Sequence, residues 1–287
     1  MREIDALGGL SGLVTDETMI QFRMLNKSKG PAMWSPRAQS DRVLFSIAWR
    51  NRLEKISNLF FWQDTVTSLL VEDNTIKGVC TGWGMKFYSK AIILTAGTFL
   101  NGLMHVGQKQ IQGGRVGEFS SFGLSSQIVS LGITADRMKT GTPARIDGRT
   151  IDFSQLEEQK PDDIPGKFSF DPKSKQILPS RSCFIAYSNI DVHNELKKGF
   201  EFSPLFSGVI KGRGPRYCPS IEDKLVTFAD KNQHLLFLEP EGVDTIEYYL
   251  NGFSSSLPLN IQLNALKKIK GFENVQIFRP AYAIEYD

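Results

Sequence analysis

The spacing of apolar residues along the chain predicts three helices. In residues 35–56 apolar side chains recur at helical spacing, with arginines on the other side. Pro36 suits the first turn of such a helix, where its missing N–H leaves no bond unmade. Residues 121–131 and 259–269 are expected to be helical as well.

Short apolar or alternating runs predict strands. The expected strands are residues 58–63, 66–71, 75–82, 84–88, 133–137, 183–187, 235–239 and 275–279. Between the second and third of these, Glu72-Asp73-Asn74 is typical turn chemistry, so we expect residues 66–82 to form a hairpin.

Residues 91–95 are apolar up to a final threonine, which is typical of a strand buried on both faces in a mainly parallel sheet. The run ends in Ala96-Gly97-Thr98, where small residues would let a nucleotide approach the backbone closely. A core strand that ends in a tight turn explains the same residues. Together with the helices, this run predicts an α/β fold.

The chain has 287 residues, which suggests about two domains at roughly 150 residues each. Its composition changes after Arg145, because residues 151–182 are charged, contain several prolines and show little periodicity. We therefore expect a less regular, inserted region at residues 145–213. Hydrophobic residues make up 41% of the sequence, which excludes disorder as the dominant state.

Charge and cysteine usage exclude several classes of protein. The 34 Lys and Arg residues nearly balance the 31 Asp and Glu residues, so the chain is neither histone-like nor an acidic tail. Three scattered cysteines exclude a disulfide scaffold and a cysteine-rich zinc site, and the three separated histidines argue against a metal site. Neither a membrane span nor a signal core is visible, so we expect a soluble, cytoplasmic protein.

The loop at residues 208–224 carries the most chemistry. Ser220 and Asp223 have the spacing of a capping box, so a helix is expected to begin directly after Ser220. Cys218 would then precede a helix N-terminus and lie near Arg216, which favours the thiolate and could also hold phosphate. A capped loop with an inert, buried cysteine is the alternative.

Other signals are weaker. The chain has no complete Gly-x-Gly-x-x-Gly, since the nearest match, from Gly212, has Tyr217 at the third glycine position. Cys80 and Cys183 lie in apolar strand patterns and are expected in the core. A basic group near the N-terminus is either a phosphate-binding surface or the solvated face of a helix and its loop. It comprises Arg23, Lys27, Lys29, Arg37, Arg42, Arg50 and Arg52, with Phe22 and Trp34 among them.

Several motifs together resemble the MnmG (GidA) family. The most specific is Gly-Pro-Arg-Tyr-Cys-Pro-Ser-Ile-Glu-Asp-Lys at residues 214–224. The others lie at residues 3–9, 21–32, 37–42, 94–100, 139–147, 232–234, 237–242 and 279–287. The resemblance spans the chain and implies a glutathione-reductase-like, Rossmann-type FAD-binding fold, incomplete here, with inserted α/β segments.

The resemblance also implies a division into domains. Residues 1–144 would belong to the FAD-binding domain, with a small insertion near residues 36–65. Residues 145–213 would form an inserted domain, and residues 214–287 an NAD-binding loop followed by a return to the FAD-binding domain. The family's Gly-x-Gly-x-x-Gly segment and a second important cysteine are expected before Met1, so the chain resembles an internal fragment. We expect it to bind FAD weakly or not at all on its own.

Members of this family use FAD and NADH to modify tRNA. With the GTPase MnmE they add a carboxymethylaminomethyl-type group at C5 of the wobble uridine, and methylene-tetrahydrofolate supplies a one-carbon unit. The resemblance therefore implies tRNA and MnmE as partners, and a homodimer. A folate- and FAD-dependent tRNA uridine C5 methyltransferase and a non-catalytic remnant that binds RNA or a partner are the alternatives.

Individual residues are assigned by the same resemblance. Val66 and Ser121 match positions that contact FAD, and Cys218 matches a cysteine implicated in activity. Thr95, Gly97 and Thr98, at the end of the apolar run, are added to the FAD site. The segment assigned to NAD comprises Gly214, Pro215, Arg216, Tyr217, Cys218, Pro219, Ser220, Ile221, Glu222, Asp223, Lys224, Leu225, Val226, Thr227 and Phe228.

Overall fold

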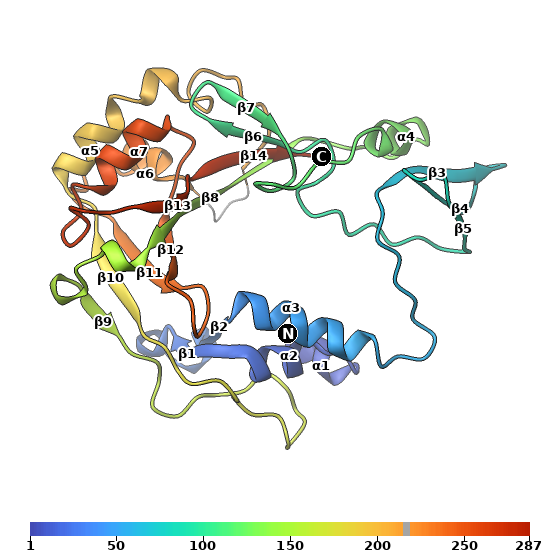
Figure 1. The fold of residues 1–287 in the computed structure, drawn as a ribbon, viewed down its shortest axis with the longest axis horizontal. Coiled ribbons are helices and arrows are strands. Elements are labelled where there is room, and N and C mark those ends of the chain that lie inside the picture. Colours follow the sequence, from blue (N-terminus) through green and yellow to red (C-terminus); the bar gives the residue numbers. More distant parts are fainter. Residues whose placement is uncertain (215–218) are drawn as a thin grey trace.

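The computed structural model describes residues 1–214 and 219–287, in which helices and strands are interspersed along the chain (Figure 1). The described strands pair into sheets of nine, three and two strands. This mixed architecture confirms the predicted α/β class. Within the same residues, no helix has the length and apolar character needed to cross a bilayer.

The nine-stranded sheet forms the centre of the molecule. Its order is β7-β6-β14-β8-β12-β11-β10-β9, with β13 beside β8, and the paired strands are antiparallel. The strands are β6 (Leu103–Val106), β7 (Lys109–Gln112), β8 (Met138–Asp147), β9 (Glu157–Gln159), β10 (Cys183–Tyr187), β11 (Leu235–Pro240), β12 (Glu247–Ser254), β13 (Ile277–Arg279) and β14 (Tyr282–Tyr286). The strands predicted at residues 183–187 and 235–239 are confirmed, and that at 275–279 is confirmed for its last three residues.

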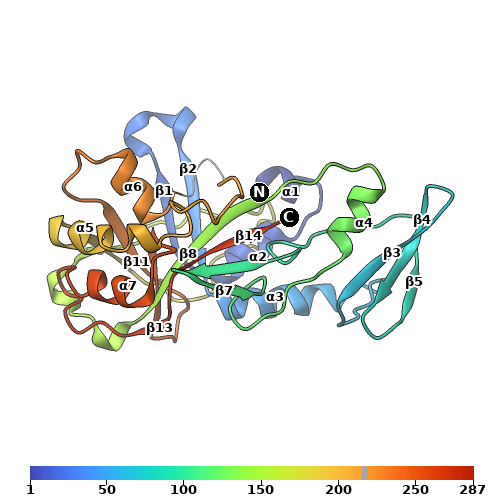
Figure 2. The same cartoon turned by 90° about the horizontal axis from the view of Figure 1, so that it is seen from above.

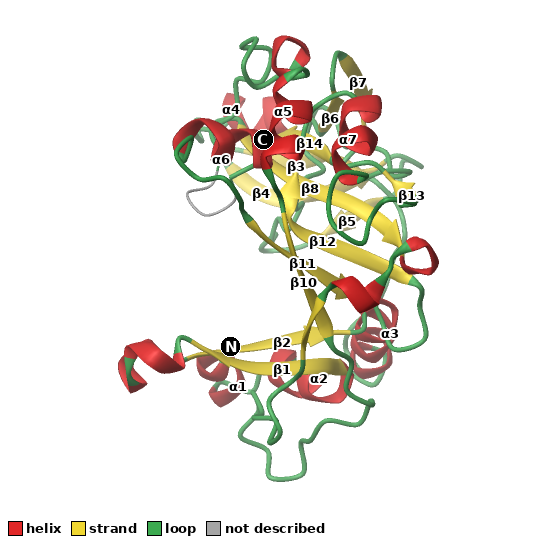
Figure 3. Ribbon diagram, turned by 90° about the vertical axis from the view of Figure 1, so that its left-hand side faces the viewer, coloured by secondary structure: helices red, strands yellow, loops and turns green. Residues whose placement is uncertain are grey.

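Three helices lie together beside this sheet (Figure 3): α5 (Ile190–Lys197), α6 (Ile221–Thr227) and α7 (Leu259–Leu266). Their apolar sides pack with residues of β8, β10, β11 and β12 in the main hydrophobic core. Its fully buried side chains include Leu196, Ile221, Leu236, Leu250, Phe253 and Leu266. Burying each side chain of this size contributes about 1.5–3 kcal/mol, so this core holds the three helices in place.

The N-terminal elements form a separate small sheet with helices. They are α1 (Arg2–Ala6), α2 (Ser11–Thr18), β1 (Met19–Leu25), β2 (Ser35–Ser40) and α3 (Arg42–Leu53), with 3₁₀ turns at Lys27–Lys29 and Pro31–Met33. The prediction of one helix over residues 35–56 is therefore wrong before Arg42. Asp41 fixes the helix start, because its carboxylate accepts the N–H groups of Val43 and Leu44 at 3.0 and 2.8 Å. The residues before this cap pair instead with β1, and that tertiary pairing outweighs their helical spacing.

The third sheet confirms the predicted hairpin and its third strand. It consists of β3 (Val66–Glu72), β4 (Thr75–Thr81) and β5 (Lys86–Tyr88), and α4 (Leu124–Ser130) lies next to it (Figure 2). The side-chain amide of Gln127 joins the two: it accepts from the N–H of Leu69 at 2.6 Å and donates to the C=O of Leu69 at 2.7 Å. This amide thereby pairs with the outer edge of β3 as a neighbouring strand would.

Residues 91–95 do not form the predicted doubly buried strand. They have no regular secondary structure, and Ile93 is 87% exposed. The expected mainly parallel sheet is wrong for the described chain as well, since its strand pairings are antiparallel. An apolar run forms such a strand only within a sheet whose two faces are both covered, and no described strand pairs with this run. Residues 58–63 and 133–137 likewise lack strand structure.

Residues 145–213 contribute to the central sheet. They supply β9, β10 and α5, and 3₁₀ turns at Gly148–Thr150, Phe153–Gln155 and Phe200–Phe202, whereas residues 160–182 are irregular as predicted. β10 pairs directly with β11, so this region shares its sheet and core with the residues that follow it. The division at residues 1–144, 145–213 and 214–287 stays a prediction.

Two histidines lie together: His193, on α5, and His234, just before β11. Ser188 Oγ is 2.7 Å from His193 Nε2 and also accepts the main-chain N–H of His234 at 2.9 Å. The rings of His193 and His234 are 5.3 Å apart, measured between centroids. Burial lowers the pKa of both imidazoles, and nearby positive charge from Lys197 or Lys224 lowers it further.

Stability should therefore fall on acidification through the histidine range. The unfolded chain binds these protons near the ordinary pKa of about 6.5, while the folded chain binds them only at lower pH. We expect the midpoint of urea unfolding to decrease between about pH 7.5 and 5.5. The decrease should be smaller in His234→Gln, which removes one of the two groups. An identical pH dependence in both proteins would contradict this assignment.

Candidate functional site

Val66 and Ser121, the two residues matched to FAD contacts, lie side by side. Val66 begins β3, and Ser121 comes shortly before α4. The hydroxyl of Ser121 is 3.3 Å from the main-chain oxygen of Val66, to which it donates. The Gln127 side chain hydrogen-bonds α4 to β3, so the contact between Val66 and Ser121 has a fixed geometry.

The turn at residues 95–98 leads into Phe99, which contacts Ser121. The N–H of Ser121 donates to the C=O of Phe99 at 2.8 Å, and the hydroxyl of Thr98 donates to the C=O of Gly114 at 2.7 Å. Gly97 has φ +57°, and a Cβ there would find its nearest neighbour at 4.0 Å. Phe99, which follows Thr98, is therefore the residue of this turn region that contacts Ser121, and the backbone of Gly97 faces open space.

In the segment assigned to NAD, Gly214 and residues 219–228 are described, while Pro215, Arg216, Tyr217 and Cys218 lie outside the described residues. The predicted capping box is confirmed. Ser220 Oγ accepts the N–H of Asp223 at 3.2 Å, and the Asp223 carboxylate accepts the N–H of Ser220 at 2.9 Å. α6 begins at Ile221, as the sequence predicts.

The inner face of α6 is anchored in the core. Glu222 is fully buried, and one of its oxygens accepts from the N–H of Ser256 at 2.7 Å and from its hydroxyl at 3.0 Å. Burial raises the pKa of Glu222, and these donors lower it in part. Ile221 and Leu225 are buried beside it, so these side chains hold the helix rather than face a ligand.

Arg137 links the two groups of predicted residues. Its guanidinium donates to the C=O of Asn101 at 3.0 Å, next to the turn that holds Thr98, and pairs with Asp287 at 2.7 Å. Its own C=O accepts the N–H of Arg213 at 3.1 Å, and the N–H of Lys139 donates to the C=O of Arg213 at 2.9 Å. Arg137 therefore contacts both Arg213, just before the segment assigned to NAD, and Asn101, next to the turn that holds Thr98.

The two described cysteines are not reactive candidates of the kind expected for Cys218. Cys183 is fully buried, as predicted, and its Sγ lies 3.2 Å from Oε1 of Gln21 and from Oε1 of Gln39, the two acceptors within reach of its one S–H. Burial raises the pKa of its thiol to about 12, so it stays protonated at neutral pH. Cys80 is half-buried in β4.

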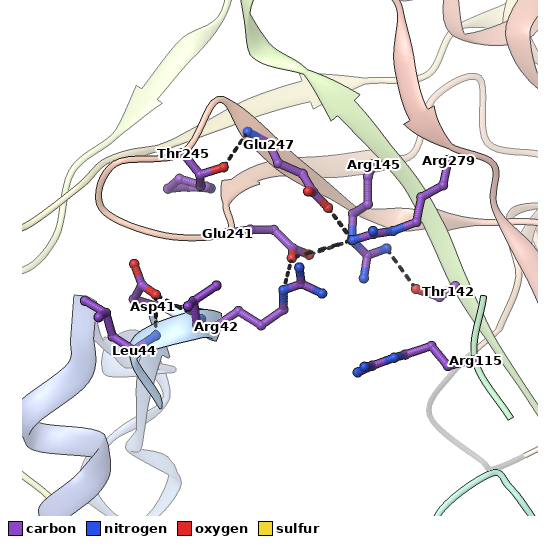
Figure 4. Close-up of polar contacts among 12 residues, drawn as sticks. Asp41, Arg42, Leu44, Arg115, Thr142, Arg145, Glu241, Thr245, Glu247 and Arg279 are labelled. Carbon is purple, nitrogen blue, oxygen red and sulfur yellow. Dashed lines mark hydrogen bonds and ion pairs between the residues drawn. The ribbon is translucent and has the colours of Figure 1, made fainter. Parts of the chain in front are cut away.

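A cluster of arginines and glutamates, which the sequence analysis missed, lies between α3 and the central sheet (Figure 4). Glu241 is 2.8 Å from Arg42 and 2.5 Å from Arg145, and Arg279 pairs with Glu247. Arg145 also stacks over the ring of Tyr249 at 4.3 Å. The only signal for this cluster in the sequence was the density of charge around Pro240, and that does not identify partners.

The basic group proposed near the N-terminus is largely neutralised. Arg37 pairs with Glu239, Arg42 with Glu241, Arg50 with Glu54, Arg52 with Glu17 and Lys27 with Asp162. Because each of these cations has an acidic partner, the structure favours the alternative of ordinary surface charge over a phosphate-binding surface.

Comparison with known proteins gives a consistent family. The family model described as Glucose inhibited division protein A matches residues 1–287. Proteins described as tRNA uridine 5-carboxymethylaminomethyl modification enzyme MnmG are 59% identical in Parabacteroides distasonis and 55% identical in Cytophaga hutchinsonii, in both cases over 287 residues. The chain spans 46% of the length of each of these relatives.

The structure is similar to that of a solved family member. The "Structure of Aquifex aeolicus GidA in the form I crystal" superposes with a TM-score of 0.92 at 48% identity, over 99% of this chain and 48% of that chain. A second crystal form of the same protein gives a TM-score of 0.89. The match of sequence and of fold over the whole chain shows that it belongs to the Glucose inhibited division protein A (GidA, MnmG) family.

Proposed function

We propose that this chain is part of a flavoprotein that modifies tRNA at C5 of the wobble uridine, adding a carboxymethylaminomethyl-type group. The observation that carries the proposal is its identity of 53–59% over all 287 residues with relatives described as MnmG. FAD and NADH are the proposed redox cofactors, and methylene-tetrahydrofolate the one-carbon donor. The GTPase MnmE and a second copy of the protein are the proposed partners.

Val66, Thr95, Gly97, Thr98 and Ser121 would hold the FAD. The contacts of Ser121 with Val66 and with Phe99, the residue after Thr98, support this, because residues that contact one extended cofactor have to lie along one surface. The open space at Gly97 fits close approach of a dinucleotide to the backbone. When bound, FAD supplies hydride and electron transfer; the chain's own residues bind and orient it.

The segment at residues 214–228 would meet NADH. Its helix α6 is fixed by the capping box and by Glu222, so the exposed residues before and after it are the ones available to a ligand. Pro219 before the helix and Phe228 after it are exposed, as is Val226 on the outer side of its last turn. Because α6 is already fixed, the segment loses less conformational entropy when a ligand binds to it.

Cys218 is the proposed nucleophile of the reaction. Cys218 precedes the N-cap Ser220 by two positions and is close in sequence to Arg213 and Arg216, and both features favour the thiolate over the thiol. Uridine becomes reactive at C5 once a group adds at C6, and a cysteine thiolate is one group able to add there. We infer that Cys218 acts near the flavin or near the folate-derived carbon.

Replacement of this nucleophile gives a direct test. Cys218→Ser should reduce tRNA modification by at least about 100-fold, on the order of 2.7 kcal/mol in the barrier, with folding unchanged. The rate should be measured by single-turnover formation of the modified nucleoside in the protein at its full natural length. Cys80→Ser is the matched control and should retain wild-type turnover. A well-folded Cys218→Ser protein with wild-type activity would contradict the role.

Flavin content provides a second test. The 287-residue chain lacks a complete Gly-x-Gly-x-x-Gly, which normally places the cofactor pyrophosphate at a helix N-terminus. We expect the chain alone to lose FAD on gel filtration, and the protein at its full natural length to retain it. The absorbance of the flavin bands before and after denaturation measures both. A colourless full-length protein would argue against the proposed function, and stoichiometric flavin on the chain alone would contradict the expected weak binding.

A further inference from the structure

Glu285 lies directly beneath the start of the segment assigned to NAD. Residing in β14, it is only 4% exposed. Its Oε1 accepts the main-chain N–H groups of Lys211 and Gly212, both at 2.9 Å. A carboxylate that accepts two backbone donors in a buried place is a strong, directional anchor.

The backbone at Gly212 approaches the sheet unusually closely. A Cβ at this position would lie 2.7 Å from the main-chain carbon and oxygen of Met138, at the start of β8. Glycine is therefore required for this approach. The two N–H groups reach Glu285 only because the chain passes this close to β8 and β14.

The other carboxylate oxygen of Glu285, Oε2, contacts a buried histidine. His105 Nε2, on β6, is 2.9 Å from Oε2, and the His105 side chain is completely buried. Nδ1 of His105 has no hydrogen-bond partner among the described residues, so the tautomer with the proton on Nε2 serves the contact. Burial lowers the pKa of His105, which keeps the imidazole neutral. Arg137 Nε lies 3.9 Å from Oε1 and completes the surroundings.

We propose that Glu285, oriented by His105, is the positioning residue that sets the start of the segment at residues 214–228 for NADH. This inference rests on the proposed function, since it names a residue that serves the NADH step. Glu222 anchors α6, in the middle of the same segment, in the core, and Glu285 holds the backbone of Lys211 and Gly212 just before the segment. The contact uses the main chain of Lys211 and Gly212, so it sets the position of the segment without meeting the cofactor.

Glu285→Ala and Glu285→Gln test this role in the protein at its full natural length. The alanine variant removes the acceptor, whereas glutamine keeps one acceptor oxygen and the volume. We expect hydrogen exchange of the Lys211 and Gly212 amides to accelerate strongly in Glu285→Ala and less in Glu285→Gln. The KM for NADH in flavin reduction should rise about tenfold in the alanine variant, about 1.4 kcal/mol, and by a smaller factor in the glutamine variant, with kcat changed less than KM.

Glu54→Gln is the matched control, because Glu54 is exposed and pairs with Arg50 of α3. It should change neither amide exchange nor KM. If Glu285→Ala unfolds, the glutamine variant carries the test, with its fold checked by circular dichroism. Faster amide exchange with an unchanged KM would overturn the inference and leave Glu285 a purely structural residue, as would unchanged exchange. Failure of the wild-type protein to oxidise NADH would instead overturn the proposed function and NADH as the ligand, while the amide exchange would still report whether Glu285 holds the backbone.

Discussion

The structure depends above all on the pairing of β8 with successive antiparallel partners. Residues 138–142 of this strand pair with β14, and its second half pairs with β12 and β13. β12 pairs along the opposite edge of β8, where the register shifts between Tyr249 and Ser254 near Pro143, and a strand tolerates proline at such an irregularity. The same strand therefore presents Lys139 to the loop before α6 and Arg145 to the arginine–glutamate cluster. A change of register in β8 would displace both groups at once.

Buried carboxylates secure the segments that pack onto this strand. Glu285 holds backbone from residues 211–212, Glu222 holds the turn at Ser256, and Glu241 is shared between Arg42 and Arg145. Glu285 and Glu241 have charged or hydrogen-bonding partners, which is the condition under which a protein tolerates a buried charge, whereas Glu222 accepts hydrogen bonds through one oxygen and burial raises its pKa. Removal of one partner leaves the other group buried without compensation, so these contacts specify the arrangement more than they add to net stability.

Local signals in the sequence identified the elements whose structure is decided locally. The hairpin of β3 and β4 follows from its alternation and its turn, and the start of α6 follows from Ser220 and Asp223. The predictions of a helix at residues 35–40 and of a strand at residues 91–95 are wrong. Residues 35–40 pair with β1 instead, and no described strand pairs with residues 91–95. His105 and Glu285 are 180 positions apart, so no spacing in the sequence could have revealed their contact. Val66 and Ser121 were named from the resemblance, and only the fold explains why they lie together.

The short helix α6 shows why such remote anchors are needed. It has seven residues, and an isolated helix of this length is unstable in water. Its capping box supplies about 1 kcal/mol, and the rest of its stability comes from Ile221, Leu225 and Glu222, which are buried in the core. The segment that carries the proposed chemistry therefore takes its geometry from strands far away in sequence. Residues 214–224 therefore combine exposed groups, which we propose meet a ligand, with buried ones such as Ile221 and Glu222 that have to fit the core and the turn at Ser256.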